Sequence, residues 1–350
     1  MAGTGQASSM RATGFAPLSD DSRPPSPEKL LPPLQRKARR NHPIRGQNRG
    51  LEGFIRRRIL ADLSMNANEA TLVWVDEYSR MAEAYDANVA PRFEPIAHEV
   101  VRLADPKANE LFLDVGTGTG LLACLLAPRV LPQGVVAIDL ADGAISAASY
   151  RAGNAGIRNI RFEMLDSRNI VYRGKLFDGV ASNLGIPGLG YDRVFQEVRR
   201  VLKPTGRFVF SEWPTDPTPS FAAFRALLES HGTRTPSKDL AQVREAVRLV
   251  RNDPEAKALG DPRAVLKALG VAGFEHRESM TKDFPVRFAR VDDLVAFGAS
   301  YGWYERELRE MTPADRAAFD AELAERLRPL TTDDGIAETW RLNFFAARPE

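Results

Sequence analysis

The chain has 350 residues, of which 43% are hydrophobic and 27% are charged, and its formal net charge is +2. This composition is that of a globular protein with a sizeable core, and it excludes a fibrous array or a small disulfide scaffold. The single cysteine, Cys124, cannot form an internal disulfide. Because we find neither a secretory signal nor an apolar run of the roughly 18 residues that a membrane span needs, we expect a cytoplasmic protein with no membrane span.

Basic charge is concentrated in residues 1–50. This segment holds nine basic and three acidic residues, a net charge of +6, whereas the rest of the chain carries −4. Its seven prolines and scarce apolar residues predict a disordered tail, because such a composition buries too little surface to offset the ordering entropy. The stretch KARRNHPIRGQNRG is compatible with contact to a nucleic acid. We favour a solvated tail, since no aromatic side chains are interleaved to stack on bases.

Residues 51–105 predict N-terminal helices. An apolar face predicts a first amphipathic helix over 53–63. A second helical stretch is expected from about 69 to 103, interrupted by Pro91 and Pro95.

Residues 106–215 consist of short apolar runs that alternate with helical stretches. The expected strands are 111–115, 135–140, 160–166, 177–183 and 206–213. The expected helices are 119–130, 143–153 and 191–203, the last ending in a Lys-Pro-Thr-Gly turn at 203–206. This alternation predicts crossover units and a parallel sheet.

The remainder of the chain predicts a helical cap at 216–275 and a mixed C-terminal region at 276–350. Cap helices are expected at 221–230, 239–250 and 262–269. In the C-terminal region, strands at 276–288 and 340–347 are expected on either side of a helical segment at 291–328.

A glycine-rich turn joins the first expected strand to the helix that follows it, in the sequence LFLDVGTGTG. Gly116, Gly118 and Gly120 allow the backbone to approach a ligand closely, and the helix N-terminus presents free N–H groups to it. Taken alone, such a turn fits nucleotides, flavins and S-adenosylmethionine.

Two cofactor classes compete for this turn. Gly118, Gly120 and Ala123, with Asp139 further along, match a dinucleotide fingerprint. However, Asp114 at the strand end would repel a pyrophosphate, whereas it suits a ligand with an ammonium and a sulfonium group. The residues therefore favour a cationic ligand.

The segment D-V-G-T-G-T-G resembles the first motif of the class I S-adenosylmethionine-dependent methyltransferases, and the other motifs of that family follow in order over about 70–215. The resemblance implies an α/β fold with a Rossmann-like seven-stranded sheet, mostly parallel, in which the strand at 340–347 is antiparallel. It also implies S-adenosyl-L-methionine as the cofactor.

The resemblance further implies a role for each matching residue. Asp139 would bind the ribose hydroxyls, and Asp166, with Ser167 beside it, would accept from the adenine amino group. Leu140 and Ile145 would enclose the adenine. The complete set of expected cofactor-binding residues is Asp114, Gly116, Thr117, Gly118, Gly120, Asp139, Leu140, Asp166, Ser167, Asn183, Leu184 and Tyr85.

The segment around Ala84-Tyr85-Asp86 resembles the helix that precedes the core in ubiquinone- and menaquinone-biosynthesis methyltransferases. That resemblance implies that Tyr78 and Tyr85 cover the methionine end of the cofactor, and packing of an amphipathic helix explains both residues equally well. The fourth-strand motif reads S-N-L-G-I-P-G, not N-P-P-Y, which disfavours N-methylation of an amide or a base. The histidine pair of the quinone group is absent from the sequence after this strand, so a quinone acceptor is not implied.

Methyl transfer requires a base only when the acceptor must lose a proton. The candidates are Glu212, at the end of the fifth strand, and His231, in the expected cap. No cluster of His, Cys and acidic residues has metal-ligand spacing, which disfavours a metal-dependent mechanism. The many aromatic residues of 213–304 suit a flat apolar acceptor.

The sequence therefore predicts a methyltransferase that acts on an oxygen or carbon atom of a small molecule. One alternative is an RNA or protein methyltransferase guided by the basic tail, and another is a non-catalytic regulatory protein that binds the same cofactor. A dinucleotide enzyme is the least favoured.

Calorimetry separates the cofactor interpretations. We expect binding of S-adenosylmethionine and S-adenosylhomocysteine but not of NAD, and a weaker affinity after Asp139→Ala, because the variant lacks the carboxylate for the ribose. NAD binding without a response to the other two ligands would contradict the cofactor assignment. An unchanged affinity in the variant would remove Asp139 from the site.

Overall fold

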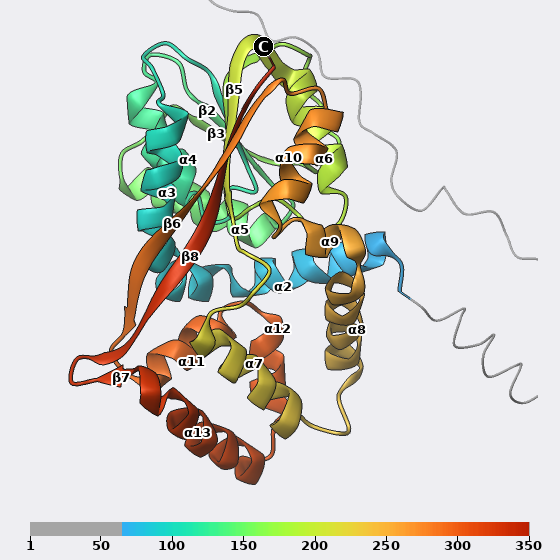
Figure 1. Ribbon diagram of the computed structural model, residues 1–350, viewed down its shortest axis with the longest axis vertical. Helices are drawn as coiled ribbons and strands as arrows, with labels where there is room; N and C mark the ends of the chain where they lie inside the picture. Colours follow the sequence, from blue (N-terminus) through green and yellow to red (C-terminus); the bar gives the residue numbers. More distant parts are fainter. Residues whose placement is uncertain (1–64, 350) are drawn as a thin grey trace, which may run out of the picture. The chain divides into compact units, whose positions relative to one another are not determined.

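The structure is a computed structural model that describes residues 65–349 (Figure 1). The expected tail at 1–50 and the expected amphipathic helix at 53–63 lie outside the described residues.

Two helices precede the sheet, α2 (Ala67–Asn88) and α3 (Ala90–Ala104). Asn66 caps the start of helix α2. Its side chain accepts from the backbone of the first turn, and the Glu69 carboxylate accepts from the Asn66 N–H. The expected interruption at Pro91 is confirmed, because α3 begins just before this residue. The expected interruption at Pro95 is wrong, since Pro95 lies inside α3, where burial of the apolar face outweighs the missing hydrogen bond.

The sheet has the order β3-β2-β1-β4-β5-β8-β6. Its strands are β1 (Phe112–Val115), β2 (Val135–Asp139), β3 (Ile160–Met164), β4 (Phe177–Asn183), β5 (Leu202–Glu212), β6 (His276–Phe288), β7 (Thr331–Thr332) and β8 (Gly335–Arg348). Strands β1 to β5 pair in parallel, and β8 runs antiparallel to both of its neighbours, β5 and β6. The expected seven-stranded arrangement is confirmed, and the two-residue β7 adds a short hairpin to β8.

Most of the described helices fall into three groups (Figure 1). Their bounds are α4 (Leu121–Leu126), α5 (Asp142–Asn154), α6 (Tyr191–Val201), α7 (Pro219–His231), α8 (Lys238–Asn252), α9 (Pro254–Ala258), α10 (Pro262–Val271), α11 (Val291–Ala299), α12 (Trp303–Glu310) and α13 (Pro313–Leu327), with 3-10 turns at η2 (Ala127–Arg129) and η3 (Arg328–Leu330). Helices α3 and α4 lie on one side of the sheet, and α6 and α10 lie on the other. Helices α7, α11, α12 and α13 gather beyond the carboxyl ends of the parallel strands, and α2 runs between this group and the sheet.

Alternate residues of the buried strands pack into two separate apolar clusters. Phe112 of β1 belongs to the cluster that includes Ile96 of α3. Its neighbour Leu113 belongs to the cluster that includes Phe195 of α6. This alternation follows from the two-residue period of a strand, and burial on both faces explains why β1 is apolar almost throughout.

Two strand boundaries differ from the sequence expectation. Strand β5 begins at Leu202, which pairs with Phe177, and the register then shifts so that Gly179 pairs with Arg207. The expected turn at 203–206 therefore lies within β5, as an irregularity in its pairing with β4, and does not precede the strand. Strand β8 is longer than expected, because it pairs with β6 over the whole of that strand.

Gly179 of β4 has no room for a side chain, since an added Cβ would lie 2.3 Å from Cζ of Phe112. We expect Gly179→Ala to lower the free energy of unfolding by about 1–3 kcal/mol, because the Phe112 ring would have to move within a packed core. Urea denaturation measures this loss. The control is Gly153→Ala in α5, where the added Cβ meets no atom within 4 Å and no loss is expected. An unchanged urea midpoint for Gly179→Ala would contradict the packing described here.

Candidate functional site

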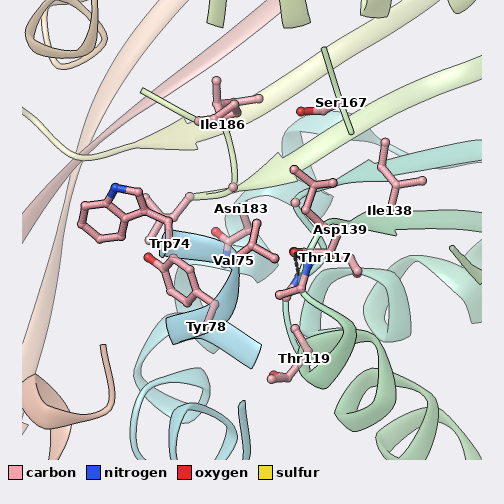
Figure 2. Close-up of a pocket in the computed structure, with 18 of the residues that line it drawn as sticks. Trp74, Val75, Tyr78, Thr117, Thr119, Ile138, Asp139, Ser167, Asn183 and Ile186 are labelled. Carbon is pink, nitrogen blue, oxygen red and sulfur yellow. Dashed lines mark hydrogen bonds between the residues drawn. The ribbon is translucent and has the colours of Figure 1, made fainter. Parts of the chain in front are cut away.

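A cavity of about 430 Å³ lies at the carboxyl ends of β1, β2 and β4. Helix α2 forms the opposite wall, from which Trp74, Val75 and Tyr78 face Asn183 and Asp139 (Figure 2). The position is the switch point of an open parallel sheet, where the chain leaves β1 and β4 toward opposite faces and a crevice remains.

The three glycines of the turn after β1 have different tasks, although all three have positive φ. A Cβ on Gly116 would lie 2.3 Å from the carbonyl oxygen of Gly185, so this glycine allows the turn to touch the loop after β4. Gly118 lines the cavity, and a Cβ there would meet nothing within 4 Å. Gly120 caps α4 and packs against Ala148, outside the cavity lining. Gly185, whose carbonyl oxygen packs against Gly116, was not identified from the sequence.

Asp114 is fully buried at the end of β1. Its Oδ2 accepts from the Thr117 hydroxyl at 2.7 Å, and its Oδ1 has no partner among the described residues. Burial raises the pKa of this carboxyl to about 7, although the Thr117 hydrogen bond opposes the shift. A buried carboxylate oxygen without a partner is costly, and a ligand with an ammonium group would supply the missing donor.

Asp139 ends β2, and backbone N–H groups hold its carboxylate. Oδ2 accepts from the N–H of Gly118 at 2.9 Å, and Oδ1 accepts from the N–H of Ala141 at 3.0 Å. Burial raises the pKa of Asp139, and these two hydrogen bonds oppose the rise. Each carboxylate oxygen can accept a second hydrogen bond, so the group can still receive donors from a diol.

Asp166 follows β3 and is clamped by Arg168. The Arg168 guanidinium donates from Nε to Oδ1 at 3.0 Å and from Nη2 to Oδ2 at 2.9 Å. Burial opposes ionisation of Asp166, but the hydrogen bonds from Arg168 give a net lowering of its pKa. Arg168 also lines the cavity and lies 3.5 Å from the Thr71 hydroxyl of α2. Sequence reasoning missed Arg168, although its position two residues after the acid was a visible signal.

Asn183 and Leu184 occupy the end of β4. The Ser211 hydroxyl donates to Oδ1 of Asn183 at 2.9 Å and accepts from the N–H of Leu184 at 3.2 Å. Leu184 has a φ of 58°, which turns the chain toward Gly185. The loop that follows adds apolar residues to the cavity, of which Ile186 is an example that no sequence motif indicated.

Every expected cofactor-binding residue lines the cavity except Gly120. Ile145, expected beside the adenine, is also outside the lining, and Ala144 of the same helix takes that place. Tyr78 and Tyr85 both line the cavity, and burial raises the pKa of each phenol.

The two candidate bases occupy different surroundings. Glu212 ends β5 and accepts from the N–H of Trp213 at 2.8 Å, and burial raises its pKa to about 8. It does not line the cavity, but its charge raises the pKa of Tyr78, which does. His231 ends α7, and its Nε2 lies 2.9 Å from Oε2 of Glu322 in α13. His231 therefore joins α7 to α13 and is not among the described residues that line the cavity.

Two further observations concern the described residues alone. Residues 65–349 contain no group of three or more His, Cys, Asp or Glu side chains placed to hold a metal ion. None of the helices in the same range is both long and apolar enough to cross a membrane.

Residues 112–206 match the family described as "Methyltransferase domain". Nocamycin O-methyltransferase of Saccharothrix syringae is 27% identical over 285 residues, which cover 77% of this chain and 96% of that protein. A demethylmenaquinone methyltransferase of Thermus thermophilus is 34% identical over 122 residues, which cover 35% of this chain and 55% of that protein. The match therefore spans nearly the whole of the first relative and about half of the second.

A solved structure also resembles the chain. The YcgJ protein of Bacillus subtilis is 17% identical, with a TM-score of 0.47, and the match covers 73% of this chain and 98% of that chain.

The buried acids give the ligand-free protein a characteristic pH dependence. Asp114 and Glu212 have native pKa values of about 7 and about 8, above their ordinary values of 3.8 and 4.5. At pH values between the ordinary and the native pKa of each acid, the native state binds more protons than the unfolded state. The free energy of unfolding should therefore fall as pH rises from 5 to about 8. Urea denaturation at a series of pH values measures this slope.

Two matched variants test the origin of this fall in the free energy of unfolding. Asp114→Asn should make the fall less steep, and Asp283→Asn should leave its slope unchanged. Asp283 is an exposed acid paired with Arg341, and its pKa is lowered by that hydrogen bond, so it stays ionised throughout this window. A decline of equal slope in Asp114→Asn would show that this carboxyl does not cause it.

Proposed function

We propose that the chain is a class I S-adenosylmethionine-dependent methyltransferase that methylates an oxygen or carbon atom of a small apolar or aromatic molecule. The observation that carries this proposal is the cavity at the strand ends, where three acids face an aromatic wall from α2. A cavity of this size that combines apolar walls with several polar side chains suits a small molecule.

The charge of the cavity supports the assignment of individual residues to the cofactor. Asp114 offers a buried oxygen without a partner, which suits the ammonium of the methionine moiety. Asp139 is held by backbone N–H groups in a position to accept from ribose hydroxyls, and Asp166 lies further along the same edge for the adenine amino group. Gly118 leaves open space where a ligand can approach the backbone. Arg168 would keep Asp166 ionised and oriented.

S-adenosylmethionine, when bound, supplies a methyl group already activated by the sulfonium, so the protein must orient the acceptor and exclude water. The side chains that line the remainder of the cavity suit that task. They are mostly aromatic or aliphatic, among them Trp74, Val75, Ile186, Leu189 and Trp303. Such walls favour a flat or apolar acceptor.

The named relatives support the same class of acceptor. Nocamycin O-methyltransferase, which aligns over most of both chains, supports transfer to oxygen. The demethylmenaquinone and aklanonic acid methyltransferases, which align over about half of their lengths, support a small-molecule acceptor. The described residues offer no observation that favours an RNA, a protein acceptor or a non-catalytic role.

We propose Glu212 as the general base, although its side chain lies outside the cavity lining. It stands at the carboxyl end of β5, the edge of the sheet that holds the cavity, and a pKa near 8 suits proton transfer near neutral pH. His231 pairs with Glu322 of α13 and is outside the cavity lining, which supports a structural role for it.

We expect Glu212→Gln to lower kcat by about 10²-fold on acceptors that must lose a proton, because the amide cannot accept it. The rate of the unmodified enzyme should rise with pH up to about 8, as the carboxyl ionises. The assay follows transfer of a radiolabelled methyl group to a panel of phenols and enolisable 1,3-diketones.

Two controls accompany this measurement. The affinity for S-adenosylhomocysteine should be unchanged in Glu212→Gln, and His231→Gln should retain full activity. A normal kcat in Glu212→Gln would exclude Glu212 as the base. Absence of methyl transfer together with absence of cofactor binding in the unmodified protein would contradict the proposed function itself.

A further inference from the structure

A buried carboxylate that belongs to none of the cofactor motifs joins helix α2 to helix α12. Glu77 of α2 is only 3% exposed. Its Oε1 accepts from Nε of Arg306 at 2.6 Å, and its Oε2 accepts from Nη2 of Arg80 at 2.7 Å. Arg306 lies in α12, 229 residues away in the sequence.

The same cluster holds the turn that precedes α12. Arg80 donates from Nη2 to the carbonyl oxygen of Gly302 at 3.1 Å and from Nη1 to Glu305 at 2.8 Å. Gly302 has a φ of 72°, and a Cβ there would lie 2.9 Å from Cβ of Glu77. The backbone of this turn is therefore pressed against α2, and any larger residue at Gly302 would separate them.

The residue that follows this turn is a wall of the cavity. Trp303 packs edge-on against Trp74, with ring centroids 4.0 Å apart, and lies 5.7 Å from Tyr78. All three side chains line the cavity. The position of the Trp303 ring thus depends on the turn, and the turn depends on the ionic cluster.

We propose that Glu77, clamped between Arg80 and Arg306, is a positioning residue that seats Trp303 against Trp74 and Tyr78 and so completes the ligand cavity. The cluster crosses from α2 to α12, and only the folded cap brings its members together. Removal of one member leaves a buried charge without its partner, which displaces the turn more readily than it unfolds the sheet. The inference rests on the proposed function only for the identity of the ligand.

The packing of Trp303 on Trp74 has its own spectroscopic signal. Two indoles in close edge-to-face contact give an exciton-coupled band in circular dichroism, and Trp303→Phe defines the part of the spectrum that belongs to this pair. The second tryptophan pair, Trp213 and Trp340 with centroids 5.3 Å apart, is expected to stay unchanged as an internal reference.

The experiment compares Glu77→Gln, Arg306→Gln and Arg306→Lys by circular dichroism and by calorimetry with S-adenosylhomocysteine. Glu77→Gln and Arg306→Gln should lose the Trp74–Trp303 band and bind S-adenosylhomocysteine about tenfold more weakly, because a wall that shifts by a fraction of an ångström loses its contacts. Arg306→Lys keeps the charge but not the planar fork, and it should restore most of both signals.

The matched control is Arg244→Gln. Arg244 of α8 makes a bidentate pair with Glu307 of the same helix α12, at 2.7 and 2.6 Å, and its other hydrogen bond goes to the carbonyl oxygen of Thr233, not to α2. This variant removes a comparable ion pair from α12 and should keep both the band and the affinity. Equal losses in Arg244→Gln, or an unchanged band and affinity in Glu77→Gln, would overturn the proposal.

The outcomes also separate this inference from the proposed function. If the unmodified protein fails to bind S-adenosylhomocysteine, the proposed function fails, and the tryptophan band still tests the positioning role. If one of the variants does not fold, Gly302→Ala tests the same turn without changing any charge, and it should likewise weaken the band.

Discussion

The contact between the two loops that leave β1 and β4 is the constraint on which the site depends. Gly116 and Gly185 lie so close that a Cβ on either one would overlap the backbone of the other. Beyond this contact the two loops lead to opposite faces of the sheet. A crevice therefore remains open between them. Asp114 and Leu184, which flank this contact, take their positions from it.

A second feature is the group of acidic side chains that line the cavity. Asp114 is buried and Asp139 is half-buried, and Arg168, which lines the same cavity, is already paired with Asp166. Burial without a cation costs free energy, which appears as the raised pKa values of Asp114 and Asp139. A cationic cofactor would remove that cost, so its binding should also stabilise the fold. The site is in this sense completed by its ligand.

Helix α2 lies between the sheet and helix α12 and contacts both sides. One side of it contacts the core, where Arg151 of α5 donates to the carbonyl oxygen of Thr119 and pairs with Asp86 of α2. Another side contacts α12 through Glu77 and Arg80. A single helix therefore supplies one wall of the cavity and also holds the turn before α12.

The sequence by itself determined the strand and helix alternation, the glycine turn and the acids after β1, β2 and β3, because these follow from local periodicity and from motifs of contiguous residues. It did not identify Gly185, Arg168 as a partner of Asp166, or the Glu77–Arg306 pair. Of the two candidate bases it favoured Glu212, at the end of a parallel strand, over His231. The tertiary structure adds the surroundings of the two candidates, since Glu212 lies at the sheet edge that holds the cavity and His231 pairs with Glu322. The physical reason is that contacts between residues far apart in the chain depend on how the helices pack, which no local pattern encodes.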